Sequence, residues 1–216
     1  YLYTYIYSIR QILNTKRNIM IEAKLGHVKT LEEFYSEIRR QQEEAHGNDY
    51  CEQHDALVRL LTKEGCTTYK ELGTNQGATA AAAMLCNPKE IELIDIDMRR
   101  YKQFLKPLAE KYCAENNIKL TVKEISSTDI GSLGISPDVL LIDSYHTPQH
   151  MRKELILHQH TVKKYMVFHD TTVLQSLYDT IAGFCSDTKV WHRKVWEIVE
   201  RGTTNVGYTV IKRIKQ

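Results

Sequence analysis

The sequence lacks the long apolar run that a membrane span requires. No stretch approaches the roughly 20 apolar residues of a spanning helix, and no secretory signal is recognised, so we expect no membrane partner. A strong charge of either sign is also missing, because 27 acidic residues stand against 29 Lys and Arg, for a net charge of +2. Dedicated nucleic-acid binders usually carry a clustered basic face, so nucleic acid is not an expected partner either.

The cysteines are few and widely spaced. The chain has five cysteines, an odd number, and no Cys-x-x-Cys pair. This favours reduced thiols in a cytosol-like compartment over disulfides or structural zinc, so the expected location is cytoplasmic. With 216 residues, of which 42% are hydrophobic and 26% charged, the chain suits one sizeable globular domain with an appendage.

The first third of the chain is charged and has helical spacing of its apolar residues. We predict an N-terminal helical appendage or lid over residues 1–55 and the main domain over residues 56–216. The tyrosine-rich start at residues 1–7 is expected to pack as a strand or a helix, and residues 49–53 as a loop. Because the chain begins with Tyr1 and not Met, we expect a piece of a longer polypeptide. The positions that recur at helical spacing are Leu31, Phe34, Tyr35 and Ile38, then Leu57, Val58, Leu60 and Leu61.

Strand and helix patterns then alternate up to about residue 172, which predicts βαβ units and a parallel sheet. The last stretch differs, because residues 194–200 and 207–213 flank a turn and predict an antiparallel hairpin. A dinucleotide dehydrogenase typically continues with further βα units instead. The predicted strands are 67–72, 91–96, 119–125, 138–143 and 165–169, and the predicted helices are 77–86, 98–116 and 148–162.

The stretch Glu71–Gly77 is the most informative of the chain. It separates a strand-like run from the alanine-rich run 78–85. Gly73 and Gly77 have no Cβ, so the backbone can turn sharply there and approach a ligand. A second apolar strand further along the chain ends at Asp95. This order predicts a nucleoside-containing cofactor, with the turn at its charged part and Asp95 at its ribose hydroxyls.

Two later apolar strands end in acidic and imidazole side chains. Asp143 and His146 follow the run 139–142, and His169 and Asp170 follow the run 165–168. If these strands are near neighbours, two carboxylates and two imidazoles converge at one mouth of the sheet. Oxygen and nitrogen ligands of this kind suit Mg²⁺ or Mn²⁺, and an imidazole can serve as general base near neutral pH.

These motifs, in this order, resemble class I S-adenosylmethionine-dependent O-methyltransferases. The resemblance covers roughly residues 55–213 and is greatest to the branch of cephalosporin-hydroxylase-like and sugar O-methyltransferases. It implies an α/β, Rossmann-like sandwich whose mainly parallel seven-stranded sheet ends in an antiparallel hairpin. The segments that carry it are Glu71–Gly77, Asp95, Ile142–Thr147, Phe168–Thr171 and Gly207–Val210.

The resemblance implies a role for each matched residue. Asp95 would accept both ribose hydroxyls, Met98 would pack near the adenine, and Ser126 and Ser127 would lie at the adenine edge. Glu71 would lie on the methionine and ribose side. The full implied set for S-adenosylmethionine is Glu71, Gly73, Thr74, Asn75, Gln76, Gly77, Asp95, Met98, Ser126 and Ser127.

For catalysis, the resemblance implies Asp143 and His146, with a divalent ion held by Asp143, His169 and Asp170. Many family members have Asp or Glu where this chain has His169, which shifts the expected ion from Mg²⁺ toward Mn²⁺. The expected reaction is methyl transfer to a hydroxyl of a sugar or glycan.

Three alternatives stay open: a catechol-like or polyketide phenol as acceptor, a non-catalytic cofactor-binding domain of a larger glycan-processing protein, and a dinucleotide oxidoreductase. The acceptor pocket is expected to come from the N-terminal helices and residues 173–193. A homo-oligomer is compatible with the sequence. His150, His158 and His160 are expected to pack or lie on the surface, and for His46 and His54 an approach to the acceptor site from a lid is the alternative to such packing.

Overall fold

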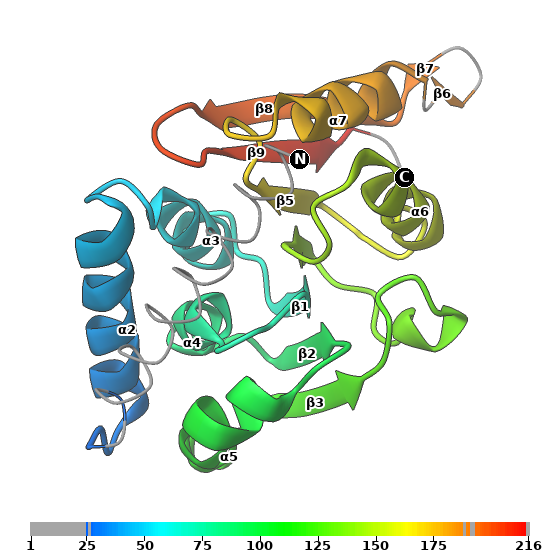
Figure 1. Ribbon diagram of the computed structural model, residues 1–216. Coiled ribbons are helices and arrows are strands. Elements are labelled where there is room, and N and C mark those ends of the chain that lie inside the picture. The colour runs from blue at the N-terminus through cyan, green and yellow to red at the C-terminus, as the bar shows by residue number, and fades with distance from the viewer. Residues whose placement is uncertain (1–24, 26, 188, 191–192, 215–216) are drawn as a thin grey trace.

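A seven-stranded sheet forms the centre of the molecule, in the order β3-β2-β1-β4-β5-β9-β8 (Figure 1). The computed structural model describes residues 25, 27–187, 189–190 and 193–214, so the predicted element at residues 1–7 lies outside the described residues. The first five strands are parallel, and β9 runs antiparallel to both β5 and β8. The strands are β1 (Thr68–Leu72), β2 (Glu90–Asp95), β3 (Lys119–Glu124), β4 (Val139–Ile142), β5 (Tyr165–His169), β8 (Trp196–Gly202) and β9 (Tyr208–Arg213), with a separate small hairpin of β6 (Lys189–Val190) and β7 (Arg193–Lys194).

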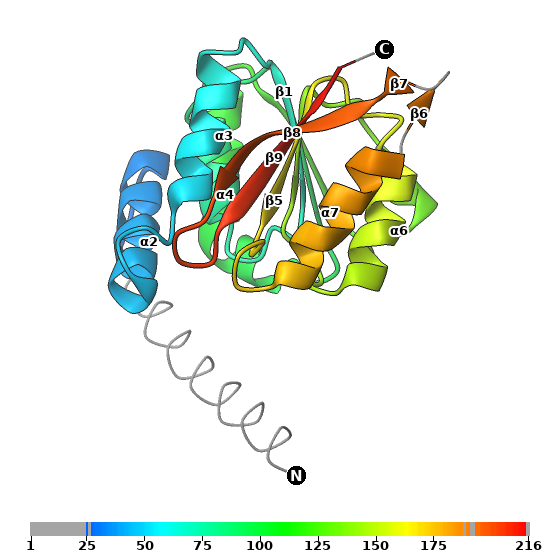
Figure 2. The ribbon, with the colours of Figure 1, turned by 90° about the horizontal axis from the view of Figure 1, so that it is seen from above.

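Helices cover both faces of this sheet. Helices α2, α3, α4 and α5 lie on one side, and α6 and α7 lie on the other (Figure 1 and Figure 2). The predicted α/β fold with a terminal antiparallel hairpin is confirmed. The helices are α2 (Leu31–His46), α3 (Glu52–Thr62), α4 (Ala78–Met84), α5 (Lys106–Glu115), α6 (Pro148–His158) and α7 (Gln175–Asp187), with a π-helical turn at Tyr101–Leu105 and a 3-10 turn at Ile130–Ser132.

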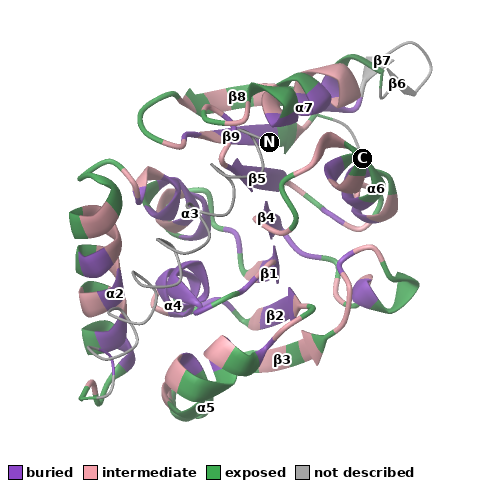
Figure 3. Ribbon diagram, viewed as in Figure 1, coloured by how far each residue is buried: buried purple, intermediate pink, exposed green. Residues whose placement is uncertain are grey.

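The hydrophobic core lies on both faces of the sheet, because side chains alternate along each strand. In β1, Tyr69 packs in the cluster under α3 and α4, whereas Leu72 packs in the cluster under α6 and α7. Successive side chains of a strand point to opposite faces, so each central strand contributes buried residues to both faces of the sheet. Figure 3 accordingly shows the central strands as buried.

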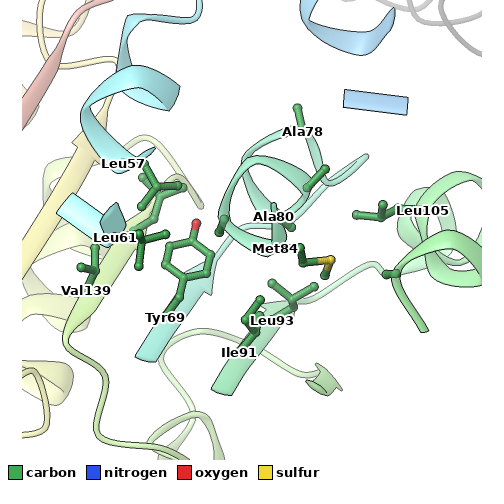
Figure 4. Close-up of a cluster of buried hydrophobic side chains, with 14 of the residues drawn as sticks. Leu57, Leu61, Tyr69, Ala78, Ala80, Met84, Ile91, Leu93, Leu105 and Val139 are labelled. Atoms are coloured by element: carbon green, nitrogen blue, oxygen red, sulfur yellow. The ribbon is translucent and has the colours of Figure 1, made fainter. Parts of the chain in front are cut away.

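The alanine run folds as α4, and all seven of its residues are buried. Figure 4 shows Ala80 and Met84 of this helix against Tyr69, Ile91 and Leu93 of the sheet. A helix that is apolar all round is buried on every side. Small side chains let α2 and α3 approach α4 closely on the side away from the sheet.

The two N-terminal helices share this core. Phe34 of α2 and Leu57 of α3 belong to the same buried cluster as Ala81 of α4. The predicted boundary between residues 55 and 56 falls inside α3. Gln53 was predicted in a loop, but it lies in the first turn of α3 and is buried, because the helix begins directly after Cys51.

Candidate active site

A cavity of about 460 Å³ opens at the carboxyl ends of β1, β2, β4 and β5. This is the edge at which open parallel sheets bind ligands, and β1 and β4 flank the point where the strand order reverses. The residues that line it are Tyr50, Gly73, Asn75, Ile94, Asp95, Ile96, Ser126, Ser127, Asp143, Ser144, Tyr145, His146, His150, His169 and Asp170.

Gly73 lies where the loops after β1 and β4 approach most closely. Its φ is +92°, and a Cβ there would lie 2.8 Å from Ser144 Cα and closer still to the carbonyl of Asp143. Its N–H donates to Ile94 O at 2.8 Å. Both the positive φ and the close approach therefore require glycine, as the sequence predicted. Gly77, with φ of +89°, lies against Leu105 behind the turn and begins α4.

Asp95 closes the glycine turn onto β2. Its Oδ2 accepts from the N–H of Asn75 at 2.8 Å, and its Oδ1 accepts from the N–H of Asp97 at 3.0 Å. A carboxylate has about four lone-pair positions, so oxygen lone pairs are left for ligand hydroxyls in the cavity. Asp97 instead accepts from Arg99 Nε at 2.8 Å on the surface.

Behind the turn lie buried polar groups that do not line the cavity. Burial raises the pKa of Glu71 to about 8, against hydrogen bonds from Tyr69 and Thr79. The hydroxyl of Thr74 and the amide nitrogen of Gln76 are buried without a partner in the structure. Buried polar atoms are rarely left unpaired, so a polar ligand group or water at this turn fits what the protein presents.

Two aspartates and two histidines converge at the other end of the cavity. His146 bridges the carboxylates, with Nε2 3.0 Å from Asp143 Oδ1 and Nδ1 3.1 Å from Asp170 Oδ2. His169 Nδ1 lies 3.1 Å from the same Asp143 oxygen and 3.6 Å from Asp170 Oδ1. Asp170 has φ of +58°, a left-handed conformation that is uncommon for residues other than glycine, although Asn and Asp adopt it more often than most.

The cluster shifts the pKa values of its two carboxyl groups in opposite directions. Burial favours the neutral acid, but the attraction of His169 and hydrogen bonds from both imidazoles hold the pKa of Asp143 below its ordinary value. Burial and the neighbouring Asp143 raise the pKa of Asp170. Burial opposes protonation of His169, yet the two carboxylates raise its pKa to about 9.

The same cluster has the donors and spacing of a metal site. One ligand atom from each of Asp143, His169 and Asp170 can be chosen so that all lie within 4.8 Å of one another. Ligands at about 2.1 Å from one ion and at right angles are about 3 Å apart, and His169 Nδ1 lies 3.1 Å and 3.6 Å from oxygens of the two carboxylates. Nδ1 of His169 is the ring nitrogen that faces both carboxylates. The residues therefore fit a divalent ion that accepts oxygen and nitrogen.

The structure places only some of the predicted cofactor residues on the cavity. Gly73, Asn75, Asp95, Ser126 and Ser127 line it. The set that lies behind this lining is Glu71, Thr74, Gln76, Gly77 and Met98. Met98 is fully buried in the core cluster under α4 and α5, because the chain turns inward after Asp97.

Six lining residues are absent from the predicted site set: Tyr50, Ile94, Ile96, Ser144, Tyr145 and His150. Ile96 and Tyr145 are exposed despite their apolar surfaces, at 75% and 68%. His150 was expected to lie on the surface or to pack, but it lines the cavity with Nε2 3.0 Å from Ser127 Oγ. Its position two residues after Pro148 at a helix start was the available signal.

Tyr50, in the loop between α2 and α3, is the residue of the N-terminal segment that lines the cavity within the described residues. Its ring stands edge-on to His169 at 5.9 Å and stacks on His46 at 4.3 Å. The carbonyl of His46 accepts from Asn205 Nδ2 at 2.7 Å, which ties this loop to the β8–β9 turn. The other predicted source of the acceptor pocket, residues 173–193, contributes no lining residue within its described part.

Comparison of the sequence with family models and with curated proteins finds no match. The fold, however, is similar to solved methyltransferase structures. A putative caffeoyl-CoA O-methyltransferase from Staphylococcus aureus aligns with a TM-score of 0.60 at 11% identity, over 92% of this chain and 99% of that one. TomG of Streptomyces achromogenes, an O-methyltransferase of tomaymycin synthesis in complex with SAM, aligns with a TM-score of 0.56 at 12% identity. The alignment covers 76% of this chain and 80% of that one. An O-methyltransferase from Bacillus cereus in complex with SAH aligns with a TM-score of 0.56 at 10% identity, over 75% of this chain and 80% of that one.

These likenesses show the Rossmann-like fold of class I methyltransferases. Within the described residues, no helix has the length and apolar character needed to cross a membrane.

Proposed function

We propose that this protein is an S-adenosylmethionine-dependent O-methyltransferase that acts on a sugar hydroxyl. The observation that carries the proposal is the division of one cavity into two chemically different ends. The glycine turn and Asp95 form a nucleoside end, and the Asp143, His146, His169 and Asp170 cluster forms a reacting end. A methyl donor held by the turn points its sulfonium toward the cluster.

The reaction is an in-line displacement at the methyl carbon, so the enzyme must align the acceptor oxygen and remove its proton. His146 lines the cavity and contacts both carboxylates. To accept the acceptor's proton, neutral His146 must turn its unprotonated nitrogen from the carboxylate that it faces toward the acceptor hydroxyl. Asp143 and Asp170 favour the imidazolium that results, and they raise the pKa of His146 although burial opposes this.

A divalent ion would be held by Asp143, His169 and Asp170. When bound, it would supply Lewis acidity that acidifies the acceptor hydroxyl. This chemistry matters most for a sugar, whose hydroxyls are poor nucleophiles. The imidazole ligand favours Mn²⁺ over Mg²⁺.

The sugar acceptor is supported by the resemblance of the two strand-end motifs to sugar O-methyltransferases. The polar reacting end, with its aromatic Tyr50 wall, also suits a hydroxyl-rich ring. A second candidate acceptor is a phenol, because the chain also has the fold of a putative caffeoyl-CoA O-methyltransferase. Phenols ionise more easily than sugar hydroxyls, so they depend less on the acid–imidazole cluster.

Cofactor binding is tested by calorimetry with S-adenosylhomocysteine. We expect wild-type binding and a loss of roughly 10- to 100-fold in Asp95→Asn, because hydrogen bonds to a charged carboxylate contribute about 1.5–3 kcal/mol. Asp97→Asn is the matched control, since this neighbouring carboxylate pairs with Arg99 on the surface. No binding by the wild type, or equal loss in both variants, contradicts the proposal.

Acceptor and metal are tested together by methyl transfer to panels of sugars and of catechols. We expect transfer to a sugar, suppression by EDTA and recovery with Mn²⁺. Asp170→Asn should abolish the recovery, whereas the exposed Asp179→Asn should not. Activity that is unchanged in EDTA and in Asp170→Asn removes the metal from the mechanism. Transfer to catechols alone replaces the sugar with a phenol, and transfer to neither panel despite cofactor binding favours a non-catalytic domain.

A further inference from the structure

A second cavity, of about 530 Å³, lies between helix α5 and the edge strand β3 and shares no lining residue with the candidate active site. One wall of this α5–β3 cavity contains Leu120 and Val122, whose side chains lie on the same face of β3 because they are two residues apart. Within the described residues no strand pairs with the outer edge of β3, and Val122 is 37% exposed. The cavity therefore offers apolar surface at the edge of the sheet.

The opposite wall is shaped by an irregularity in the helix that precedes β3. Pro107 has no N–H, and its ring would clash with the carbonyl four residues earlier, so the regular helical bonds are interrupted there. The chain widens just before it into the π-helical turn Tyr101–Leu105, in which the N–H of Lys106 donates to the carbonyl of Tyr101. Turns of this kind are frequent at functional sites. Tyr101 and Lys106 both line the cavity.

Tyr101 brings to the cavity a hydroxyl that the protein leaves without a partner. The residue is 1% exposed, and its hydroxyl has no hydrogen-bond partner among the described residues. A buried tyrosine hydroxyl usually has one. Burial raises the pKa of this hydroxyl, and the nearby Glu110 and Cys113, which both line the cavity, raise it further. The hydroxyl therefore lies on the cavity side of Tyr101, where a polar ligand group can complete its hydrogen bonding.

The charges at the rim of the cavity favour an anion. Two ammonium groups, those of Lys102 and Lys106, line it together with one carboxylate, that of Glu110. Lys106 Nζ lies 3.5 Å from Glu110 Oε1, and both side chains are about half exposed. Exposed pairs of this kind add little to stability, so a ligand carboxylate can take the place of Glu110 beside Lys106.

We propose that the α5–β3 cavity is a second ligand site, which binds a small amphipathic acid. The apolar body of the acid packs on Leu120 and Val122. Its anionic group faces Lys102 and Lys106 at the rim, and a polar group at its other end reaches the hydroxyl of Tyr101. The binding of this acid does not depend on the identity of the cofactor.

The π-helical turn connects this ligand site to the glycine turn. Leu105, at the other end of the π-helical turn from Tyr101, is fully buried and lies against Gly77, where an added Cβ would be 3.4 Å from Leu105 Cγ. Figure 4 shows Leu105 reaching toward α4, the helix that begins after Gly77. A ligand that holds Tyr101 in place also fixes this support of the glycine turn, so occupancy of the cavity changes cofactor affinity. This coupling rests on the proposed function.

The test uses 4-hydroxyphenylacetate as the probe, because it carries a hydroxyl and a carboxylate at opposite ends of an apolar ring. Amide chemical shifts of isotope-labelled protein report where the probe binds. We expect saturable binding in the millimolar range or tighter, with shift changes along α5 and β3. Phenylacetate, which lacks the hydroxyl, and 2-(4-hydroxyphenyl)ethanol, which lacks the charge, should each bind about 5- to 10-fold more weakly, the loss that one hydrogen bond of ordinary net strength produces.

Variants at the two ends of the ligand locate it. Tyr101→Phe should bind both acids equally well and should keep its Tm, because the hydroxyl has no partner to lose. Tyr112→Phe is the matched control, since that hydroxyl donates to Asn87. Lys106→Met should weaken the binding of the acids but not of the alcohol, whereas Lys111→Met, on the same helix outside the cavity, should change neither. A variant that fills the cavity from an exposed position of α5, Ala114→Trp, should block all three probes.

Calorimetry with S-adenosylhomocysteine, with and without saturating probe, measures the coupling. We expect its affinity to change about fivefold or more in the wild type, with no change in Ala114→Trp. No saturable probe binding, or binding that survives in both Tyr101→Phe and Ala114→Trp, overturns the ligand site. Probe binding with unchanged S-adenosylhomocysteine affinity overturns the coupling alone. A wild type that binds the probe but no S-adenosylhomocysteine overturns the proposed function and supports the ligand site.

Discussion

A buried ion pair under the middle of the sheet gives a prediction whose size can be worked out from its contacts. Lys70 of β1 and Glu92 of β2 are both fully buried, with Nζ 3.0 Å from Oε2. Lys70 also donates to the carbonyls of Ser132 and Leu133, the latter at 2.6 Å. The pair therefore anchors the loop that carries Ser127.

The two partners are not equivalent. If Lys70→Met removes the ammonium, Glu92 still has Lys123 at 2.8 Å and the N–H of Ile135 at 3.1 Å. The cost is then two carbonyls without a donor, partly offset by the apolar side chain, or about 2 kcal/mol. If Glu92→Gln removes the carboxylate, a fully buried ammonium loses its countercharge, which costs about 3–5 kcal/mol.

Thermal unfolding measures the difference. For a chain of this size each kcal/mol shifts Tm by about 2–4 °C, so we expect a loss of about 6–20 °C in Glu92→Gln and about 4–8 °C in Lys70→Met. Glu90→Gln is the control, because its partner Lys119 is largely exposed, and such pairs contribute about 1 kcal/mol or less. A larger loss in Lys70→Met than in Glu92→Gln, or no loss in either, refutes the reasoning.

Three further predictions concern the site. Gly73→Ala, which forces a Cβ at φ of +92° against the backbone of Asp143 and Ser144, should cost more than about 2 kcal/mol and abolish S-adenosylhomocysteine binding; an unchanged Tm would contradict it. Glu71 has a raised pKa, so it binds its proton more tightly in the folded state, and its stabilisation is present below pH 4.5 and lost as pH rises through about 8. Denaturant titrations between pH 4.5 and about 8 should show the unfolding free energy of the wild type falling by up to roughly 1.4 kcal/mol per pH unit relative to Glu71→Gln. The same dependence of the unfolding free energy on pH in both proteins would rule this out. Tyr50→Ala should raise the acceptor KM about tenfold through the lost aromatic contact and leave cofactor binding unchanged, which steady-state kinetics and calorimetry can check.

The strands and the glycine turn could be predicted because their signals are local. Apolar runs define β4 and β5, and shorter alternations of apolar and polar residues define β1, β2 and the edge strand β3; all five predicted parallel strands are found. Asp143 and His169 could be placed together because parallel strands end at one edge. Helix α7 was not predicted, since its stripe of Leu177, Ile181 and Cys185 has no strong capping signal.

The remaining features depend on packing that one sequence does not reveal. The π-helical turn at Tyr101–Leu105 sits inside what the sequence predicts as a single helix from 98 to 116. Met98 turns inward only because the chain folds back after Asp97. His150 resembles any helix-surface histidine until Glu154 and Ser127 are seen beside it.

The alanine helix α4 bears on whether the N-terminal segment can be separated from the rest. Helix α4 is buried on its outer side because α2 and α3 pack on it. Removing the chain up to the end of α3 would therefore expose an apolar, alanine-rich helix surface next to the glycine turn. The two helices are therefore part of the same hydrophobic core as α4, which follows the turn, and they do not form a module that could be exchanged between proteins. Acceptor preference could then change through the short loop carrying Tyr50, with the helices on either side of it unchanged.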